Sequence, residues 1–399
     1  MANVRVLDCC TGVGGMGLLI HHTPVMYVER EPFCRDILQR RMDDGCLPEA
    51  PISDNVTNLD TAVIAKLNVT HIFAGFPCQD ISSMGIRKGI QPDTRSGLLF
   101  DILRTAVELR TPWLFLENVE ALLRNESMWC TVVRAVSASG YDMAWTLVAA
   151  SHLGAPHVRR RWFALCRRRR EGQPNVLTPD PGRHRYPSGI MIGGKIQPLD
   201  IETPKVPRPP KIGLRAPTEN AEWKELEATK KSIQYWATPR TSASSCNKLT
   251  LRSAKDLGTQ LRYAVTTPTE QAYRLQTGIC ASSEYVEWMM GFPKDWTNAT
   301  VSVSQKDFKA FKDFKDFKAR HWGREPSIRT VKARNEPNSR KRQRCLGNAC
   351  VPQTSARAWS ILNAVWDTHI QRKKRARATT PQAQVPKVPK TMKKTKQCA

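Results

Sequence analysis

The stretch Val4-Arg-Val-Leu-Asp-Cys-Cys-Thr-Gly-Val-Gly-Gly15 decides the fold class of this chain. Residues 4–7 alternate and then become apolar, as a first strand does, and a glycine-rich turn follows. Three glycines permit a tight turn and a close approach of the backbone to a ligand: Gly12, Gly14 and Gly15. With a helical run expected from Met16, this order is typical of the opening of a nucleotide-binding βαβ unit. A plain tight turn without a ligand explains the glycines equally well.

Three acidic residues accompany this unit. Asp8 ends the first strand, and Glu29 follows the next apolar strand, residues 25–28. A carboxylate in the position of Glu29 can accept two hydrogen bonds from a ribose diol, although a solvated strand end is the simpler interpretation. Asp54 is placed either to cap a helix or to accept a hydrogen bond from an adenine amino group.

A second motif is His71-Ile-Phe-Ala-Gly-Phe-Pro-Cys-Gln-Asp-Ile-Ser82. Residues 72–74 read as a buried strand that Gly75 and Pro77 end. Cys78 is therefore predicted on a loop just past the carboxyl end of a strand, where ligands collect in open parallel sheets. In that position Cys78 is a candidate nucleophile. The alternative is a small buried hydrophobic residue, as most free cysteines are.

A carboxylate and two arginines follow Cys78 along the chain. Residues 113–116 predict a buried strand that ends in Glu117-Asn118-Val119, and this strand can neighbour that of Cys78. Residues 157–166 predict another, partly buried strand. On it Arg159 and Arg161 share one face. An ordinary basic surface strand is the alternative for these two arginines.

Composition limits the classes of partner. The chain has 399 residues, a net charge of +26 and a pI near 9.9. Such an excess of positive charge favours nucleic acid over a membrane as partner. The sequence contains no run of 18 apolar residues, so no membrane span is predicted. The amino terminus begins with a strand pattern, which leaves no room for a signal peptide. The 12 cysteines lack metal-site spacing and are interpreted as reduced thiols of a cytosolic or nuclear protein.

Together these motifs resemble those of the DNA (cytosine-5)-methyltransferases, of the phage, viral or bacterial type found in restriction–modification. The matching residues, in the order of the family, are Asp8, Gly12-Val-Gly-Gly15, Glu29, Asp54, Pro77-Cys78-Gln79, Glu117-Asn118-Val119, Arg159, Arg161 and Gly347-Asn348. The resemblance covers about residues 1–166 and 340–366. It implies an α/β, Rossmann-like, S-adenosylmethionine-dependent methyltransferase fold with a smaller target-recognition domain.

The resemblance also implies roles for these residues. The Cys78 thiolate adds to carbon 6 of a cytosine flipped out of a specific duplex DNA sequence, and carbon 5 then attacks the methyl group. The other catalytic residues are Glu117 at N3, Arg161 at O2 and Arg159, which supports the loop or a phosphate. The cofactor, S-adenosylmethionine, is bound by Asp8, Cys10, Gly12, Gly14, Gly15, Glu29, Asp54, Pro77 and Asn348. Two positions depart from the family: Cys10 replaces a phenylalanine, and His157 replaces a glutamine.

The implied organisation has five parts. They are a catalytic and cofactor-binding domain (1–166), a target-recognition domain (167–285), a connecting region (286–339), a helix that completes the catalytic domain (340–366) and a disordered basic tail (367–399). The target-recognition domain has one convincing helix, Glu219–Tyr235. The Lys/Phe-rich residues 306–318 are expected to pack on the small domain rather than to contact DNA. The protein is expected to be a monomer, in the cytoplasm of a bacterial or phage-infected cell or in a eukaryotic nucleus.

Two other functions remain open. The transfer-RNA methyltransferase branch shares this catalytic core, but its Cys-Phe-Thr signature is absent from the predicted small domain. A catalytically silent DNA-binding relative is the second alternative, suggested by the departures at Cys10 and His157. The Asp/Asn-Pro-Pro-aromatic motif of adenine and N4-cytosine methyltransferases is absent.

Overall fold

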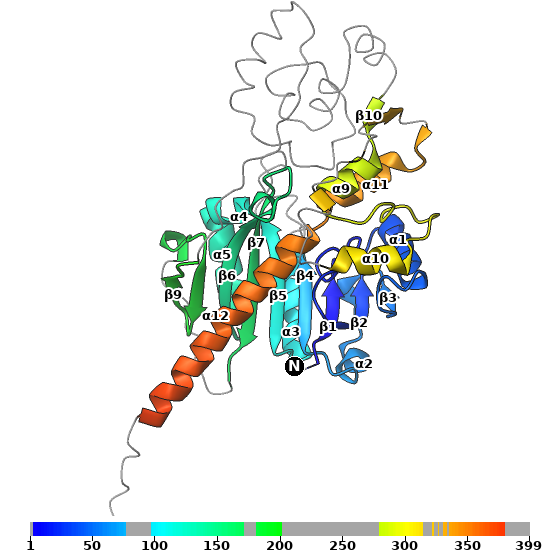
Figure 1. The fold of residues 1–399 in the computed structure, drawn as a ribbon. Helices are drawn as coiled ribbons and strands as arrows, with labels where there is room; N and C mark the ends of the chain where they lie inside the picture. The colour runs from blue at the N-terminus through cyan, green and yellow to red at the C-terminus, as the bar shows by residue number, and fades with distance from the viewer. Residues whose placement is uncertain are drawn as a thin grey trace, which may run out of the picture.

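The computed structural model describes residues 3–76, 97–170, 181–201, 279–313, 321, 322, 326, 330–332 and 335–379 (Figure 1). Several predicted features lie outside these residues. They are Pro77-Cys78-Gln79, the helix Glu219–Tyr235, the second half of the Lys/Phe-rich run and the tail from residue 380. None of the helices within the described ranges is long and apolar enough to cross a membrane.

A nine-stranded sheet forms the centre of the described part, in the order β3-β2-β1-β4-β5-β7-β6-β8-β9. The strands are β1 (Arg5–Cys9), β2 (Thr23–Val28), β3 (Ile52–Ser53), β4 (His71–Gly75), β5 (Trp113–Val119), β6 (Tyr141–Ala149), β7 (Arg160–Arg168), β8 (Gly189–Ile192) and β9 (Lys195–Pro198). The pairs from β3 to β5 are parallel and the remaining pairs antiparallel. This confirms the α/β, Rossmann-like class. The strands β8 and β9 lie within the range predicted for the small domain, yet they belong to the large sheet.

Helices connect and cover these strands. They are α1 (Pro32–Asp43), α2 (Thr61–Ala65), α3 (Leu98–Glu108), α4 (Ala121–Arg124), α5 (Glu126–Ala138), α9 (Ser283–Met289), α10 (Gln305–Lys312), α11 (Ser339–Asn348) and α12 (Pro352–Thr379). Short 3₁₀ turns occur at Val56–Asn58, Ala150–Leu153 and Pro181–Arg183. A separate antiparallel pair joins β10 (Ile279–Ala281) to β11 (Thr330–Lys332).

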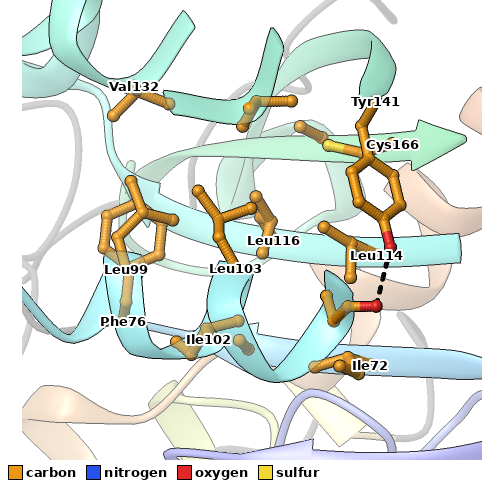
Figure 2. Packing of buried hydrophobic residues seen from close by; sticks show 14 of the residues in the cluster. Ile72, Phe76, Leu99, Ile102, Leu103, Leu114, Leu116, Val132, Tyr141 and Cys166 are labelled. Carbon is orange, nitrogen blue, oxygen red and sulfur yellow. Dashed lines mark hydrogen bonds between the residues drawn. The ribbon is translucent and has the colours of Figure 1, made fainter. Parts of the chain in front are cut away.

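One face of the sheet is covered by α3 and α5. Side chains alternate along each strand, so every second residue points to this face. The buried positions of α3 recur with helical spacing: Leu99, Ile102, Leu103 and Ala106. Figure 2 shows Leu99, Ile102 and Leu103 near Ile72, Leu114 and Leu116 of the sheet. The Tyr141 hydroxyl donates to the carbonyls of Ala106 and Thr111, at 3.3 and 2.6 Å, and so ties the end of α3 to β6.

The opposite face is covered by α12, which crosses the sheet diagonally (Figure 1). The strand residues between those of the first face pack here, with Phe73, Phe115 and Phe163 under the helix. The Trp366 indole donates to the Leu165 carbonyl at 2.9 Å. The predicted return of the last helix to the large domain is confirmed. This helix continues to Thr379, into the segment expected to be disordered, because lysine, arginine and alanine dominate there and no glycine or proline interrupts it.

The helix predicted from Met16 is absent. Residues 11–20 form successive turns instead, with the Gly14 amide bonded to the Thr11 carbonyl at 3.0 Å. Glycine is a poor helix former, and the neighbouring segments leave no room for larger side chains. A Cβ on Gly15 would lie 2.4 Å from the Cys350 carbonyl oxygen, which requires a backbone shift. The glycine stretch is therefore folded against a segment more than 300 residues away.

The described part of the Lys/Phe-rich run packs beside this glycine stretch, and its expected packing on the small domain involves residues outside the described ranges. This described part is α10, and Phe308 is buried in it. The Phe308 ring stacks on Trp296 at 5.6 Å between centroids, and the Trp296 indole donates to the Val13 carbonyl at 2.8 Å. These residues share one core cluster with α1. The period of three therefore did not reveal the surface against which the run packs.

Candidate active site

Glu117 lies at the carboxyl end of β5, next to the strand that leads to Cys78. In the parallel register of β4 and β5 Gly75 pairs with Glu117, so the predicted neighbourhood of the two strands is confirmed. On the other side β7 runs antiparallel to β5. The Arg161 Nε donates to Glu117 Oε1 at 3.0 Å, and the two side chains are 16% and 12% exposed. Glu117 and Arg161 are thus brought together as a shielded ion pair.

The environment of Glu117 increases its affinity for a proton. Burial raises the pKa of Glu117, and the guanidinium groups of Arg161 and Arg159 offset only part of this effect. A carboxyl group with a raised pKa is suited to share or donate a proton when negative charge develops beside it. This chemistry fits a ring nitrogen that becomes more basic during a reaction.

Arg159 lies just before β7 and not on it. Its backbone has a φ of +22°, and β7 begins at Arg160, so the expectation that Arg159 and Arg161 share a strand face is wrong. The turn directs the buried Arg159 guanidinium to the carboxyl end of α11. There it donates to the carbonyls of Gly347 and Ala349 at 3.1 and 2.6 Å. Arg159 consequently holds the backbone on both sides of Asn348, whose side chain is exposed.

Asn118 fixes the chain at the entry to the Cys78 segment. It is buried, and its amide nitrogen donates to the Phe76 carbonyl at 3.4 Å while its oxygen accepts from the Val119 amide at 2.8 Å. Phe76 is buried as well, directly before Pro77. Asn118 belongs to the Glu117-Asn118-Val119 motif, but the sequence alone predicts no role for it. Its position one residue after Glu117 was the available signal.

His157 is fully buried two residues before Arg159. Its Nε2 donates to the Met289 carbonyl at the end of α9, at 2.8 Å. Burial, followed by the charge of Arg159, lowers the pKa of His157 to about 3, so the ring is neutral. The residue that departs from the family pattern therefore connects the arginine turn to α9.

Asp8, Gly12 and Glu29 lie together at the carboxyl ends of β1 and β2. The Glu29 carboxylate accepts from the Gly12 amide at 2.7 Å and from the Glu31 amide at 2.8 Å. Asp8 is 2% exposed, and its Oδ1 has no hydrogen-bond partner within the described residues. Burial, followed by the charge of Glu29, raises the pKa of Asp8 to about 8. Burial also raises the pKa of Glu29.

Two more of the predicted cofactor residues, Cys10 and Asp54, directly follow strands of the same parallel sheet. Cys10 has a φ of +55°, and burial, followed by Glu29, raises its pKa to about 12. Asp54 is exposed at the end of β3, the neighbour of β2. The capping role considered for Asp54 is wrong, because Asn55 caps the following turn and accepts from the Thr57 amide at 3.0 Å.

These residues fit a cationic nucleoside such as S-adenosylmethionine. The orphaned Asp8 oxygen is buried and needs a donor or a positive charge. Gly12 has a φ of +60° and nothing within 4 Å of the position of a Cβ, so the backbone is open to a ligand there. Two further carboxylates, Glu29 and Asp54, follow the next strands of the parallel sheet.

A buried ionic network that the sequence did not predict supports this edge from the α11 side. Arg342 was read as part of a basic run, but it is only 5% exposed. Its guanidinium contacts Glu287 at 3.0 Å and Glu336 at 3.2 Å. Glu287 also accepts from Thr297. The signal was weak, because all five residues of the run 340–344 are basic or polar and only the helical spacing of α11 distinguishes Arg342.

Several known proteins are similar to this chain in sequence or in fold. The family model of C-5 cytosine-specific DNA methylases matches residues 4–394. The chain is 32% identical over 167 residues to the type II methyltransferase M.CviJI of Paramecium bursaria Chlorella virus IL3A, which is 41% of this chain and 43% of that protein. It is 31% identical over 171 residues to M2.BsuMI of Bacillus subtilis, 41% of each chain. The matched part thus spans less than half the length of these curated relatives.

Among solved structures, the crystal structure of a mutant of Spodoptera frugiperda DNMT2 is similar in fold. The TM-score is 0.51 at 15% sequence identity, and the alignment covers 90% of this chain and 99% of that one. At this identity the likeness supports the fold alone.

Proposed function

The chain belongs to the C-5 cytosine-specific DNA methylase family, and from this premise we propose that it transfers a methyl group from S-adenosylmethionine to carbon 5 of a cytosine in duplex DNA. One observation carries the proposal. The shielded pair of Glu117 and Arg161 stands beside the strand that leads into Pro77-Cys78. The net charge of +26 supports a polyanionic substrate.

Cys78 acts as the nucleophile in this proposal. Carbon 5 of cytosine is a weak nucleophile, and addition of the Cys78 thiolate to carbon 6 makes the ring an enamine that is reactive at carbon 5. Glu117 holds a proton at N3 as electron density moves onto the ring. Arg161 orients Glu117 through their ion pair and is suited to the O2 oxygen. Loss of the proton from carbon 5 then allows Cys78 to leave.

Asp8, Gly12 and Glu29 would hold the cofactor, with Cys10, Asp54 and the glycines at 14 and 15 around them. When bound, S-adenosylmethionine supplies an electrophilic methyl group. Asp8 would balance its positive charge, and Glu29, fixed by two backbone amides, would accept from hydroxyl groups. Arg159 would keep Asn348 at the same edge through the carbonyls of Gly347 and Ala349.

The substrate base must leave the DNA stack to meet this edge. Inside a duplex the neighbouring bases cover carbon 6, so an enzyme acting there flips the nucleotide out. In the proposal Glu117 and Arg161 read the Watson–Crick edge of the flipped cytosine. Placing the target opposite an abasic site should therefore tighten binding about tenfold, because no base pair has to be broken.

The proposal is tested on the DNA of cells that express the full chain. Bisulfite sequencing should reveal 5-methylcytosine in one short sequence, and Cys78→Ser should abolish it, since a serine hydroxyl is almost fully protonated near neutral pH. Cys130→Ser, a half-buried cysteine on α5, is the matched control and should retain methylation. Duplex DNA with 5-fluorocytosine should trap the wild-type chain covalently.

Unmodified DNA from cells that contain folded wild-type protein would refute the proposal. The same methyl-transfer assay with transfer RNA separates the RNA-directed branch, which would label RNA and leave duplex DNA unlabelled. Binding of DNA without any methyl transfer would identify a silent relative.

A further inference from the structure

Two cysteines from distant parts of the sequence meet on the α1 side of the fold. Cys34 is in the first turn of α1 and Cys345 is in α11, and their Sγ atoms are 3.1 Å apart. Both are buried, at 5% and 7% exposure. A disulfide has a sulfur–sulfur bond of about 2.05 Å, so an approach of about 1 Å would bring the two sulfurs to bonding distance.

The two segments carrying these cysteines border the proposed site from different sides. The Cys34 amide bonds to the Glu31 carbonyl at 3.0 Å, and the Glu31 amide donates to Glu29. Cys345 precedes Gly347, whose carbonyl Arg159 binds. Contacts between the charged residues of both segments reinforce the pairing, since Arg344 lies 4.0 Å from Glu31.

We propose that Cys34 and Cys345 are a dithiol pair that oxidises to a reversible disulfide joining α1 to α11, with a low-molecular-weight disulfide such as oxidised glutathione as the oxidant. One cysteine thiolate attacks oxidised glutathione, forming a mixed disulfide and releasing one glutathione thiolate. The other cysteine attacks the protein sulfur of that mixed disulfide and releases the second glutathione. The two cysteines lose two electrons, oxidised glutathione gains them, and the two thiol protons pass to the released glutathiones.

The same burial sets the rate of this reaction. The hydrogen bond to Cys345 and burial raise the pKa of Cys34, and the charges of Glu29 and Glu31 act in the same direction. Because the thiolate is the attacking form, the closed pair reacts slowly and α11 must move away from α1 for the first attack. Once formed, the disulfide is shielded from reductants by the same packing.

Peptide mapping of the oxidised full chain tests the proposal. Reduced protein is incubated with oxidised glutathione, alkylated and digested with trypsin. The expected product is peptide 31–35 joined to peptide 345–357, with no glutathione adduct. The second peptide also contains Cys350, so the link is mapped again in Cys350→Ser, where it should persist. It should be lost in Cys34→Ala and in Cys345→Ala, while Cys46→Ala, a buried cysteine of the same core cluster, should retain it.

Thermal unfolding gives a second readout. Oxidation should raise the Tm of the wild-type chain by roughly 5 °C, and dithiothreitol should reverse the rise. Cys34→Ala should show no such difference. Three outcomes would overturn the proposal. They are alkylation of both cysteines as free thiols after oxidation, a persistent mixed disulfide with glutathione, and a link that maps to Cys350. If an alanine variant does not fold, the wild-type peptide map alone decides between these outcomes.

Discussion

The two halves of the sheet's carboxyl edge both contain buried carboxyl groups, but they neutralise them differently. In the half around β5 and β7, Glu117 is ion-paired to Arg161 at 3.0 Å. In the half around β1 and β2, burial raises the pKa of both Asp8 and Glu29, and the described residues show no ion pair for either. A buried carboxylate without a cation is costly. In the first half a cation of the protein balances the charge, whereas in the second Asp8 retains a proton until, in the proposed function, a cationic ligand binds.

Glu117→Gln should have the largest effect on activity, and it should affect only the half around β5 and β7. The amide keeps the shape but cannot hold a proton at N3, so methyl transfer should fall by about a thousandfold. Affinity for S-adenosylhomocysteine should stay within about twofold, because the change is confined to the β5 half. A tritiated-methyl assay and calorimetry measure the two quantities. Turnover within tenfold of wild type would remove Glu117 from the proposed role.

Asp8→Asn should act on the other half. The wild-type pKa of about 8 means that Asp8 is largely protonated at pH 7 before a cation binds. Binding of S-adenosylmethionine should then release up to about one proton, and its affinity should increase as the pH rises toward about 8. Titration calorimetry in buffers of different ionisation enthalpy measures this release. If the Asp8→Asn variant still releases the proton, another group is its source.

The same pKa predicts how the stability of the ligand-free protein changes with pH. The folded pKa is raised above the usual value of 3.8, so the contribution of Asp8 is fully present below that value and is lost as the pH rises through about 8. The Tm of the wild-type chain should fall across this window. The Tm of Asp8→Asn should fall less over the same pH range. Equal slopes of Tm against pH for the two proteins would contradict the assignment of this pKa to Asp8.

Arg159→Ala tests the backbone support shared by both halves. Loss of its bonds to Gly347 and Ala349 leaves buried carbonyls without a donor, and the free energy of unfolding should drop by about 2 kcal/mol. Arg160→Ala is the matched control. That side chain is 50% exposed, so a change below about 0.5 kcal/mol is expected in urea unfolding. Equal losses in both variants would mean that the Arg159 bonds contribute little.

The basic tail should affect neither half. Deleting residues 380–399 removes five lysines and leaves α12 intact. If these lysines contact phosphates, the salt dependence of DNA binding should flatten and the methylated sequence should stay the same. A changed target sequence in the truncated chain would show that the tail takes part in recognition.

The sequence predicted those parts of the edge that depend on local pattern. Apolar runs located the strands that carry Asp8, Glu29 and Glu117, because buried parallel strands are continuous in apolar residues. The helix predicted from Met16 was wrong, since Gly15, directly before it, packs against Cys350, a contact that no local pattern contains. The turn at Arg159 was missed for the same reason.

Long-range packing also explains the other differences. The strand register alone would place Arg159 beside Arg161, but the carbonyls at the end of α11 accept its hydrogen bonds. Asp54 and Asn55 are both good capping residues, so sequence could not choose between them. Arg342 looked like a surface residue because its partners, Glu287 and Glu336, lie on other segments.

The covering of one sheet face by α12 has a consequence for synthesis on the ribosome. The Trp366 indole binds Leu165 across 201 residues of chain. At a translation rate of about 5–20 residues per second, the strands wait roughly 10–40 s for the helix that covers them. During that time Phe73, Phe115 and Phe163 lack their cover, which is the kind of exposed apolar surface that chaperones bind. The yield of folded protein should therefore depend on chaperone supply more than on the stability of the finished fold.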